Sequence, residues 1–565
     1  MAASPMPEMS GGIWERFASL FRLAEEREQL LVPAVILAGV LLSVLLLVLP
    51  GATYSGKYTN DVFIFFDNAH RLLAGQVPNR DFHSPLGPLA YVLPAFGLRV
   101  GGLGGFMPWA TAAFLLLLTP ILLYVCRSRL PVGFAIGFGI YTVLLAAGPV
   151  NIGDEVDSTS FAMFYNRWGY ALLGLLFLMI LPRREGRGSR WIDAAAAALL
   201  LMLMFYLKVS YFMFGAALMV PLFFLLPSQR FMAPASLALT ALGIGLVELA
   251  WGGTGNYLRD IAAAAEASGA LRGTLFTLSR LALQNFMACI LFLFVMGLAV
   301  YRSVRWQTLL LCLYMAGAGL LLANQNAQGP GLLTLIPAAL VAILAPGRNE
   351  ATTAPLWPRL TGSLLLAALV LPPATVSAVT LGYFSIKSAR PTGGPYEQQI
   401  GDFITAEGMI DPLKIGPQGQ RRVYRAERAD LDIYNKIKNT KYRQGFSQPE
   451  FLITLKDGMD LLRREPRLEG KIFVFDMGNP FSGLLGRESP RGVDAWNHVN
   501  RTFTETSYRP PQRMFADVDV VLIPKVATDL PTVEAMQRVY GPYLSLAFEP
   551  VATSDYWRAY RKRRL

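Results

Sequence analysis

The residues most able to do chemistry lie in one stretch near the N-terminus, residues 57–96, whose sequence is KYTNDVFIFFDNAHRLLAGQVPNRDFHSPLGPLAYVLPAF. Asp61 stands about ten residues after the first long apolar run, and a carboxylate there could take a proton from a hydroxyl group. Apolar residues then recur at helical spacing as far as Gly75, which predicts a surface helix over 62–74. Because Asp is also a favoured helix N-cap, a purely structural role for Asp61 stays open.

A short polar segment, Asn79 to His83, follows the predicted helix. Asp81 and His83 could bind a phosphate, a sugar or a divalent ion, whereas Asp81 could equally do no more than stabilise a turn. A metal site in this region would be assembled from Asp61, Asp81 and His83. One histidine with carboxylates is too small a set to establish such a site from sequence.

Two basic residues occur where an apolar environment makes a charge costly. Arg167 lies about one helical turn into a predicted membrane span, so it needs an anionic partner or a water-filled cavity. Its partner could be a phosphate or the acidic loop that precedes the span. Lys208 lies at the turn between two predicted spans, where it could reach the membrane interface or bind a phosphate.

Other polar residues could form hydrogen bonds with sugar hydroxyls. The segment 151–160 is acidic and contains no Lys or Arg, and the segment 324–329 carries four amides. A solvated loop and the capping of helix ends are the structural alternatives. The candidates for contact with a sugar or an acceptor are Asp81, Asp154, Glu155, Asp157, Tyr165, Asn166, Asn324, Gln325 and Asn326.

Membrane helices are the elements that would position these residues. The chain is 53% hydrophobic and 16% charged, whereas soluble domains carry about 25% charged residues. The apolar surplus falls before residue 385, in runs long enough to cross a bilayer core of ~30 Å. We expect a polytopic α-helical membrane protein with about eleven spans, near 31–50, 104–126, 131–149, 161–182, 191–207, 209–227, 231–251, 281–300, 306–324, 330–346 and 358–383.

The distribution of Lys and Arg predicts the orientation. With the amphipathic N-terminal segment 1–29 in the cytoplasm, the inner segments hold 13 Lys and Arg, whereas the longer outer loops up to residue 329 hold 8, as the positive-inside rule requires. The run 84–103 is apolar enough to cross, but counting it would reverse this asymmetry. We therefore predict an interfacial or re-entrant helix there. Residues 30–384 then form the transmembrane domain, and residues 385–565 lie outside the cytoplasm, whereas a twelve-span alternative would put residues 385–565 in the cytoplasm.

The C-terminal region is predicted to be a small soluble α/β domain. Amphipathic helices are expected over 449–465 and 532–544, and buried strands over 471–476 and 517–524. No glycine-rich phosphate loop is present, and GPQG at 416–419 is expected to form a turn. The three cysteines show neither disulfide nor zinc-ligand spacing. Much of the net charge of +12 lies in short loops and the terminal RAYRKRRL, so no nucleic-acid partner is expected.

The stretch 57–96 resembles the first outer loop of the GT-C superfamily of membrane glycosyltransferases. This superfamily includes the protein O-mannosyltransferases and the transferase that adds aminoarabinose to lipid A. The residues that carry the resemblance are Asp61, Ala69, Gly75, Pro78, Asp81, Pro85 and Leu86. Val62 replaces the Glu that usually follows the Asp, and Phe82 to Ser84 replace a charged pair. The resemblance also makes 51–103 the catalytic loop and 84–103 a second juxtamembrane helix.

The resemblance implies that a sugar moves from a polyprenyl-phosphate carrier to a hydroxyl of a glycan, lipid or protein at the outer face of the cell (inner or plasma) membrane. Asp61 would be the general base, and Arg167, Lys208 and His83 would bind the donor phosphate. No cofactor is established, and a divalent cation such as Mg²⁺ or Mn²⁺ is left open. The alternatives are a glycan polymerase or ligase, a lipid-linked sugar flippase or transporter, and a non-catalytic scaffold.

Overall fold

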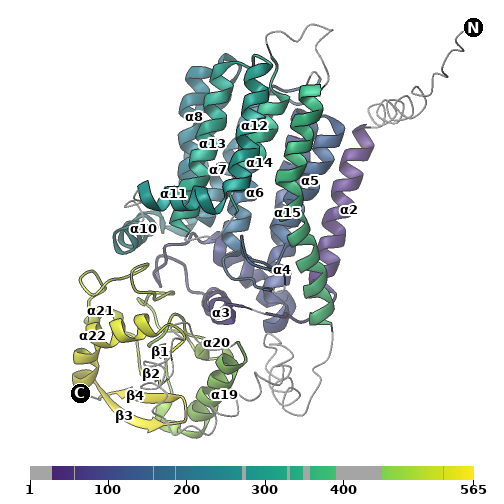
Figure 1. The fold of residues 1–565 in the computed structure, drawn as a ribbon. Helices are drawn as coiled ribbons and strands as arrows, with labels where there is room; N and C mark the ends of the chain where they lie inside the picture. Colours follow the sequence, from purple (N-terminus) through teal and green to yellow (C-terminus); the bar gives the residue numbers. More distant parts are fainter. Residues whose placement is uncertain are drawn as a thin grey trace, which may run out of the picture.

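The computed structural model describes residues 28–55, 57–156, 158–184, 186–269, 275–326, 331–347, 357–389, 448–525 and 527–564. These residues form a bundle of helices followed by a smaller domain that contains a four-stranded sheet (Figure 1). The turn predicted at 416–419 lies outside the described residues.

Every apolar segment predicted to cross the membrane contains a helix. Six helical ranges are long and apolar enough to span a membrane, or seven if a pair bent by 82° counts as one span. The described residues thus form a mostly helical membrane protein, and the number of eleven spans stays a prediction. The bundle helices are α2 (Glu28–Val48), α4 (Leu89–Arg129), α5 (Val132–Ala147), α6 (Phe164–Leu178), α7 (Arg190–Leu207), α8 (Val209–Leu225), α9 (Met232–Trp251), α11 (Leu275–Gln284), α12 (Phe286–Tyr301), α13 (Trp306–Gln325), α14 (Leu335–Leu344) and α15 (Trp357–Ser388).

The apolar run 84–103, which the sequence predicts to be an interfacial or re-entrant helix and not a span, forms a separate helical segment at the start of α4. Gly102 breaks the helix with φ 60 and ψ −169, a backbone conformation that is essentially restricted to glycine. A Cβ atom added at Gly97 would collide with the backbone oxygen of Phe106. In a straight helix residues nine apart are separated by ~13 Å along the axis, so the chain folds back at Gly102 and packs against itself. The segment before the break therefore does not continue the span that follows it.

Two of the basic segments predicted to lie inside, 126–129 and 183–190, share one end of the bundle. Arg129 forms a 2.6 Å ion pair with Asp193, and the backbone N–H of Arg184 donates to the Ser128 oxygen. Figure 1 shows the start of α2 at this end and α3 (Thr59–Leu73) with the C-terminal domain at the other. These two basic segments therefore lie at the end of the bundle away from the C-terminal domain, and the orientation of the bundle in the membrane stays a prediction.

The C-terminal domain has mixed α/β structure, as predicted. The expected helices are α19 (Gln448–Arg464) and α22 (Leu530–Ala547), and the expected strands are β1 (Ile472–Val474) and β2 (Val520–Pro524). The sheet order is β1-β2-β4-β3, with β1 and β2 parallel and the other pairs antiparallel. The sequence did not reveal β3 (Phe548–Thr553) or β4 (Trp557–Lys562). In β4 the alternation of buried and exposed residues is short, and the basic residues of the terminal segment obscure it.

The domain is bound to α3 by both apolar and polar contacts. Phe63 on α3 packs against Phe451 on α19 with ring centres 5.6 Å apart. Beside them, Asp67 and Arg71 form a 2.9 Å ion pair, and each side chain is only 1% exposed. Arg71 Nη1 also donates to the Pro490 oxygen at 2.6 Å. Ser489 of the domain also donates to Asp67 at 3.1 Å. Because both members of this buried pair find a further partner across the interface, α3 and the domain hold each other in place.

Candidate functional site

A cavity of about 600 Å³ lies between the helical bundle and the C-terminal domain. It receives side chains from α3, from the start of α6, from the turn between α7 and α8, and from α10 (Thr254–Ser268). Residues of the C-terminal domain close its remaining side. The polar and aromatic residues that line it are Lys57, Tyr58, Asn60, Asp61, Tyr165, Asn166, Lys208, Ser210, Ser268, Gln325, Asn326, Trp496, His498, Arg501, Thr528 and Asp529.

Asp61 lies inside α3 and does not cap it. The helix begins at Thr59, and its N-cap is Tyr58, in the left-handed region with φ 55, so the N-cap interpretation is wrong by three residues. The Asp61 carboxylate accepts a 2.9 Å hydrogen bond from Asn60 Nδ2. Burial raises the pKa of Asp61 from 3.8 to about 7, although the charge of Arg501 and the Asn60 hydrogen bond oppose this. A carboxylate with a pKa near neutral is a stronger base than an ordinary Asp and is still ionised in a large fraction of molecules.

Lys208 is held in the same cavity entirely by neutral groups. Its Nζ donates to the side-chain oxygens of Asn166, at 3.1 Å, and of Asn326. The same atom lies 4.9 Å from the centre of the Tyr165 ring. Among the described residues no carboxylate forms an ion pair with it, and burial together with the charge of Arg501 lowers the pKa of Lys208 to about 7, so a bound anion is needed to hold its full positive charge. A site of this kind is suited to an anionic ligand.

The C-terminal domain contributes a second cation, which the sequence did not reveal. Arg501 is half-buried and lines the cavity, and its charge acts on both Asp61 and Lys208. In the part of the chain that the structure describes, no carboxylate lies within ion-pair distance of its guanidinium. Arg501 follows Asp61 by more than four hundred residues, so only the docking of the domain brings the two together.

Two further groups of the domain present unused hydrogen-bonding atoms. Trp496 Nε1 and His498 Nδ1 are buried and have no hydrogen-bond partner among the described residues. Burial and the nearby charge of Arg501 hold the pKa of His498 well below its usual value, so its ring is neutral at pH 7. Asp529, in contrast, has a hydrogen-bond partner, because it caps α22 by accepting from the backbone N–H of Thr532 at 3.2 Å.

The remaining predicted residues divide between this cavity and other places. Tyr165, Asn166, Gln325 and Asn326 line it together with Asp61 and Lys208. Asn324, one residue earlier, is half-buried and does not line it. The cavity thus brings together six predicted site residues that come from four distant segments of the sequence.

Asp81 and His83 are not brought to the cavity. Asp81 accepts from the Val77 N–H at 2.8 Å and forms a 2.9 Å ion pair with Arg491, so it stabilises a turn and the domain interface. His83 Nδ1 lies 3.0 Å from Asp260 Oδ1. Both residues therefore have structural partners, and neither stands beside Asp61. Among the described residues no three His, Cys, Asp or Glu side chains are grouped so that they could hold a metal ion.

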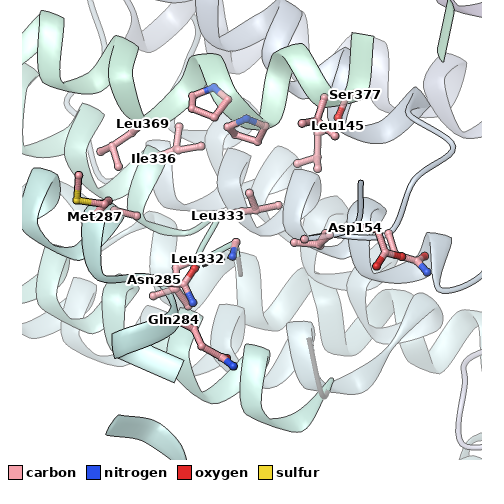
Figure 2. A pocket seen from close by; sticks show the side chains of 18 of the residues that line it. Leu145, Asp154, Gln284, Asn285, Met287, Leu332, Leu333, Ile336, Leu369 and Ser377 are labelled. Atoms are coloured by element: carbon pink, nitrogen blue, oxygen red, sulfur yellow. Dashed lines mark hydrogen bonds between the residues drawn. The ribbon is translucent and has the colours of Figure 1, made fainter. Parts of the chain in front are cut away.

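Arg167 and Asp154 line a second cavity, of about 530 Å³. Asp154 also forms a 2.7 Å ion pair with Lys57, which lines the first cavity. Figure 2 shows Asp154 at one end of the second cavity and the apolar side chains of Leu333, Ile336 and Leu369 along it. The structure thus separates Arg167 from Lys208, which the sequence had grouped as phosphate ligands. Glu155 is exposed and lines neither cavity, and Asp157 lies outside the described residues.

Comparison of the chain with models of protein families, with characterised proteins and with solved structures finds no match.

Proposed function

We propose that this protein is a membrane glycosyltransferase of the GT-C type that moves a sugar from a polyprenyl-phosphate carrier to an acceptor hydroxyl. One observation carries the proposal. A carboxylate whose pKa is raised to about 7 shares a cavity with two cations, Lys208 and Arg501, that lack carboxylate partners among the described residues. Base and phosphate ligands are the groups that such a transfer needs in one place.

In the proposed step, Asp61 accepts the proton of the acceptor hydroxyl as its oxygen attacks the anomeric carbon of the sugar. The bond between that carbon and the phosphate oxygen breaks, and its electron pair stays on the carrier phosphate. Lys208 and Arg501 hold this phosphate while its negative charge grows. Among the described residues no carboxylate forms an ion pair with either cation, so both can bind the product anion.

The amides and aromatic rings around the cations supply contacts for the sugar. Asn166 and Asn326 hold Lys208, and each amide has further hydrogen-bonding capacity. Trp496 and His498 offer donors and ring faces from the opposite wall. Since the domain completes the cavity, we propose that it closes over the bound sugar and contributes to the choice of acceptor.

The location of the cavity favours a transferase over a transporter. Its polar residues gather where the bundle meets the C-terminal domain, at one end of the helices. A transporter is expected to bind its substrate near the middle of the bilayer, between interrupted helices. We place the reaction at the outer face of the cell membrane, in line with the distribution of basic residues.

Purified full-length protein, incubated with synthetic polyprenyl-phosphate hexoses and pentoses and an extract of membrane acceptors, tests the proposal through the release of free polyprenyl phosphate. Asp61→Asn should lower this release by roughly 10²- to 10⁴-fold, the usual contribution of a general base. Glu266→Gln, on the exposed face of α10, is the matched control and should retain full activity. Release by the Asp61→Asn variant at the wild-type rate would remove Asp61 as the base.

A further inference from the structure

The second cavity contains a buried cation for which the described residues supply no ion-pair partner. Arg167, on α6, is 1% exposed, and its Nη1 donates to the Val150 oxygen at 2.7 Å. Its other two guanidinium nitrogens, Nε and Nη2, are buried and have no hydrogen-bond partner among the described residues. A buried guanidinium in an apolar bundle is costly unless an anion or a polar ligand satisfies it.

The polar end of this cavity offers acceptors as well as donors. Both side-chain polar atoms of Asn151 are buried without partners, and so is Asp154 Oδ2. The other oxygen of Asp154 is paired with Lys57 at 2.7 Å, which neutralises that carboxylate. Arg167 is therefore left as one unbalanced positive charge beside unused acceptors. A ligand that matches this end carries one negative charge and neighbouring hydroxyl groups.

The rest of the cavity is mainly apolar, although Gln284, Asn285 and Ser377 also line it, and it lies beside side chains exposed at the surface of the bundle. Leu333, Ile336 and Leu369 line its interior (Figure 2). At the bend between α11 and α12, Phe286 is 52% exposed and Met287 is 74% exposed, and both also line the cavity. Exposed apolar side chains at the bend of a membrane-spanning pair face lipid chains, so the cavity can admit an acyl chain from the bilayer.

We infer that this cavity is a binding site for an anionic glycerophospholipid of the phosphatidylglycerol class, with its phosphate on Arg167. The headgroup hydroxyls donate to Asp154 Oδ2 and the Asn151 oxygen, and an acyl chain lies against α12, α14 and α15. The site is separate from the Asp61 cavity, because α6 and the Lys57–Asp154 pair stand between them and present different residues to each. The inference does not depend on glycosyl transfer.

The test measures which lipids stay bound to the purified full-length protein, by native mass spectrometry after exposure to vesicles of defined composition. Wild-type protein should retain phosphatidylglycerol at least tenfold better than phosphatidylcholine or phosphatidylethanolamine. Arg167→Gln should abolish this preference, whereas Lys208→Gln, in the other cavity, should keep it. Arg259→Gln, an exposed residue of α10, controls for the loss of one positive charge.

A second variant keeps the inference testable if Arg167→Gln fails to fold. Ala368→Trp places a ring at an exposed position of α15 that lines the cavity, so it should fold and exclude the acyl chain. Retention of phosphatidylglycerol should then fall by about tenfold. Unchanged retention in both variants would overturn the inference. Equal retention of all three phospholipids, or preferential retention of polyprenyl phosphate by the Arg167 cavity, would overturn it as well.

Discussion

Replacing Asp61 by Asn should make the protein more stable while it abolishes sugar transfer. The substitution removes a charge from a poorly solvated position but keeps a side-chain oxygen that can accept from Asn60. The side chain keeps nearly the same size and the same position in α3. The expected gain in stability therefore comes from the charge alone, and it should depend on pH.

The magnitude follows from the pKa of Asp61, which burial raises from 3.8 to about 7. At ~1.4 kcal/mol per pH unit, the ionised carboxylate costs at most about 4 kcal/mol of folding free energy. Between these two pKa values the folded protein keeps a proton that the unfolded chain has released. Stability is therefore lost as the pH rises from about 4 to about 7, and the loss is complete above pH 7.

Thermal unfolding of both proteins in detergent measures this difference. The advantage of Asp61→Asn should grow from about 1 kcal/mol at pH 4.5 to about 4 kcal/mol at pH 8. Asp460→Asn, at a half-exposed site on α19, should show no such growth. An advantage that is equal at both pH values, or a loss of stability at pH 8, would refute the assignment of a raised pKa to Asp61.

Three further predictions concern catalysis, the docking of the C-terminal domain on α3 and the fold-back of the chain at Gly102. Transfer by the wild-type protein should rise with pH and level off above about 7, since Asp61 must be ionised to act as a base; a flat profile between pH 5 and 8 would exclude this role. Arg71→Met should lower the free energy of unfolding by about 3 to 5 kcal/mol in denaturant titrations, because Asp67 would remain buried without its partner. Gly97→Ala should lower the melting temperature by several degrees, because the added Cβ would meet the Phe106 backbone. Gly137→Ala, which has open space around it, should leave the melting temperature unchanged. Equal effects of the two substitutions would contradict the fold-back of the chain at Gly102.

The helical part of the fold could be predicted from sequence because its physical signal is local. Runs of apolar residues identify membrane helices wherever they occur, and each predicted span contains a helix. Gly102, the glycine that turns the chain back, lies within the run that the charge count had already set apart from the spans. The strands β3 and β4 escaped prediction because Arg558 and its basic neighbours hide the short alternation of buried residues.

The candidate site could be predicted only in part, for a different reason. Asp61 could be singled out because it opens a predicted surface helix just after the first apolar run, and Lys208 because it lies at the turn between two predicted spans. Arg501 gave no such signal, since an arginine in a soluble domain is unremarkable until its position is known. The division between Arg167 and Lys208 also could not be foreseen, because it depends on which face of α6 each cavity touches.

The most direct test of the proposed mechanism is a structure of the protein with a polyprenyl phosphate bound. The phosphate should lie in the cavity beside Asp61, within hydrogen-bond distance of Lys208 Nζ and of the Arg501 guanidinium. A phosphate bound away from these two cations, or one that meets Arg167 instead, would contradict this mechanism.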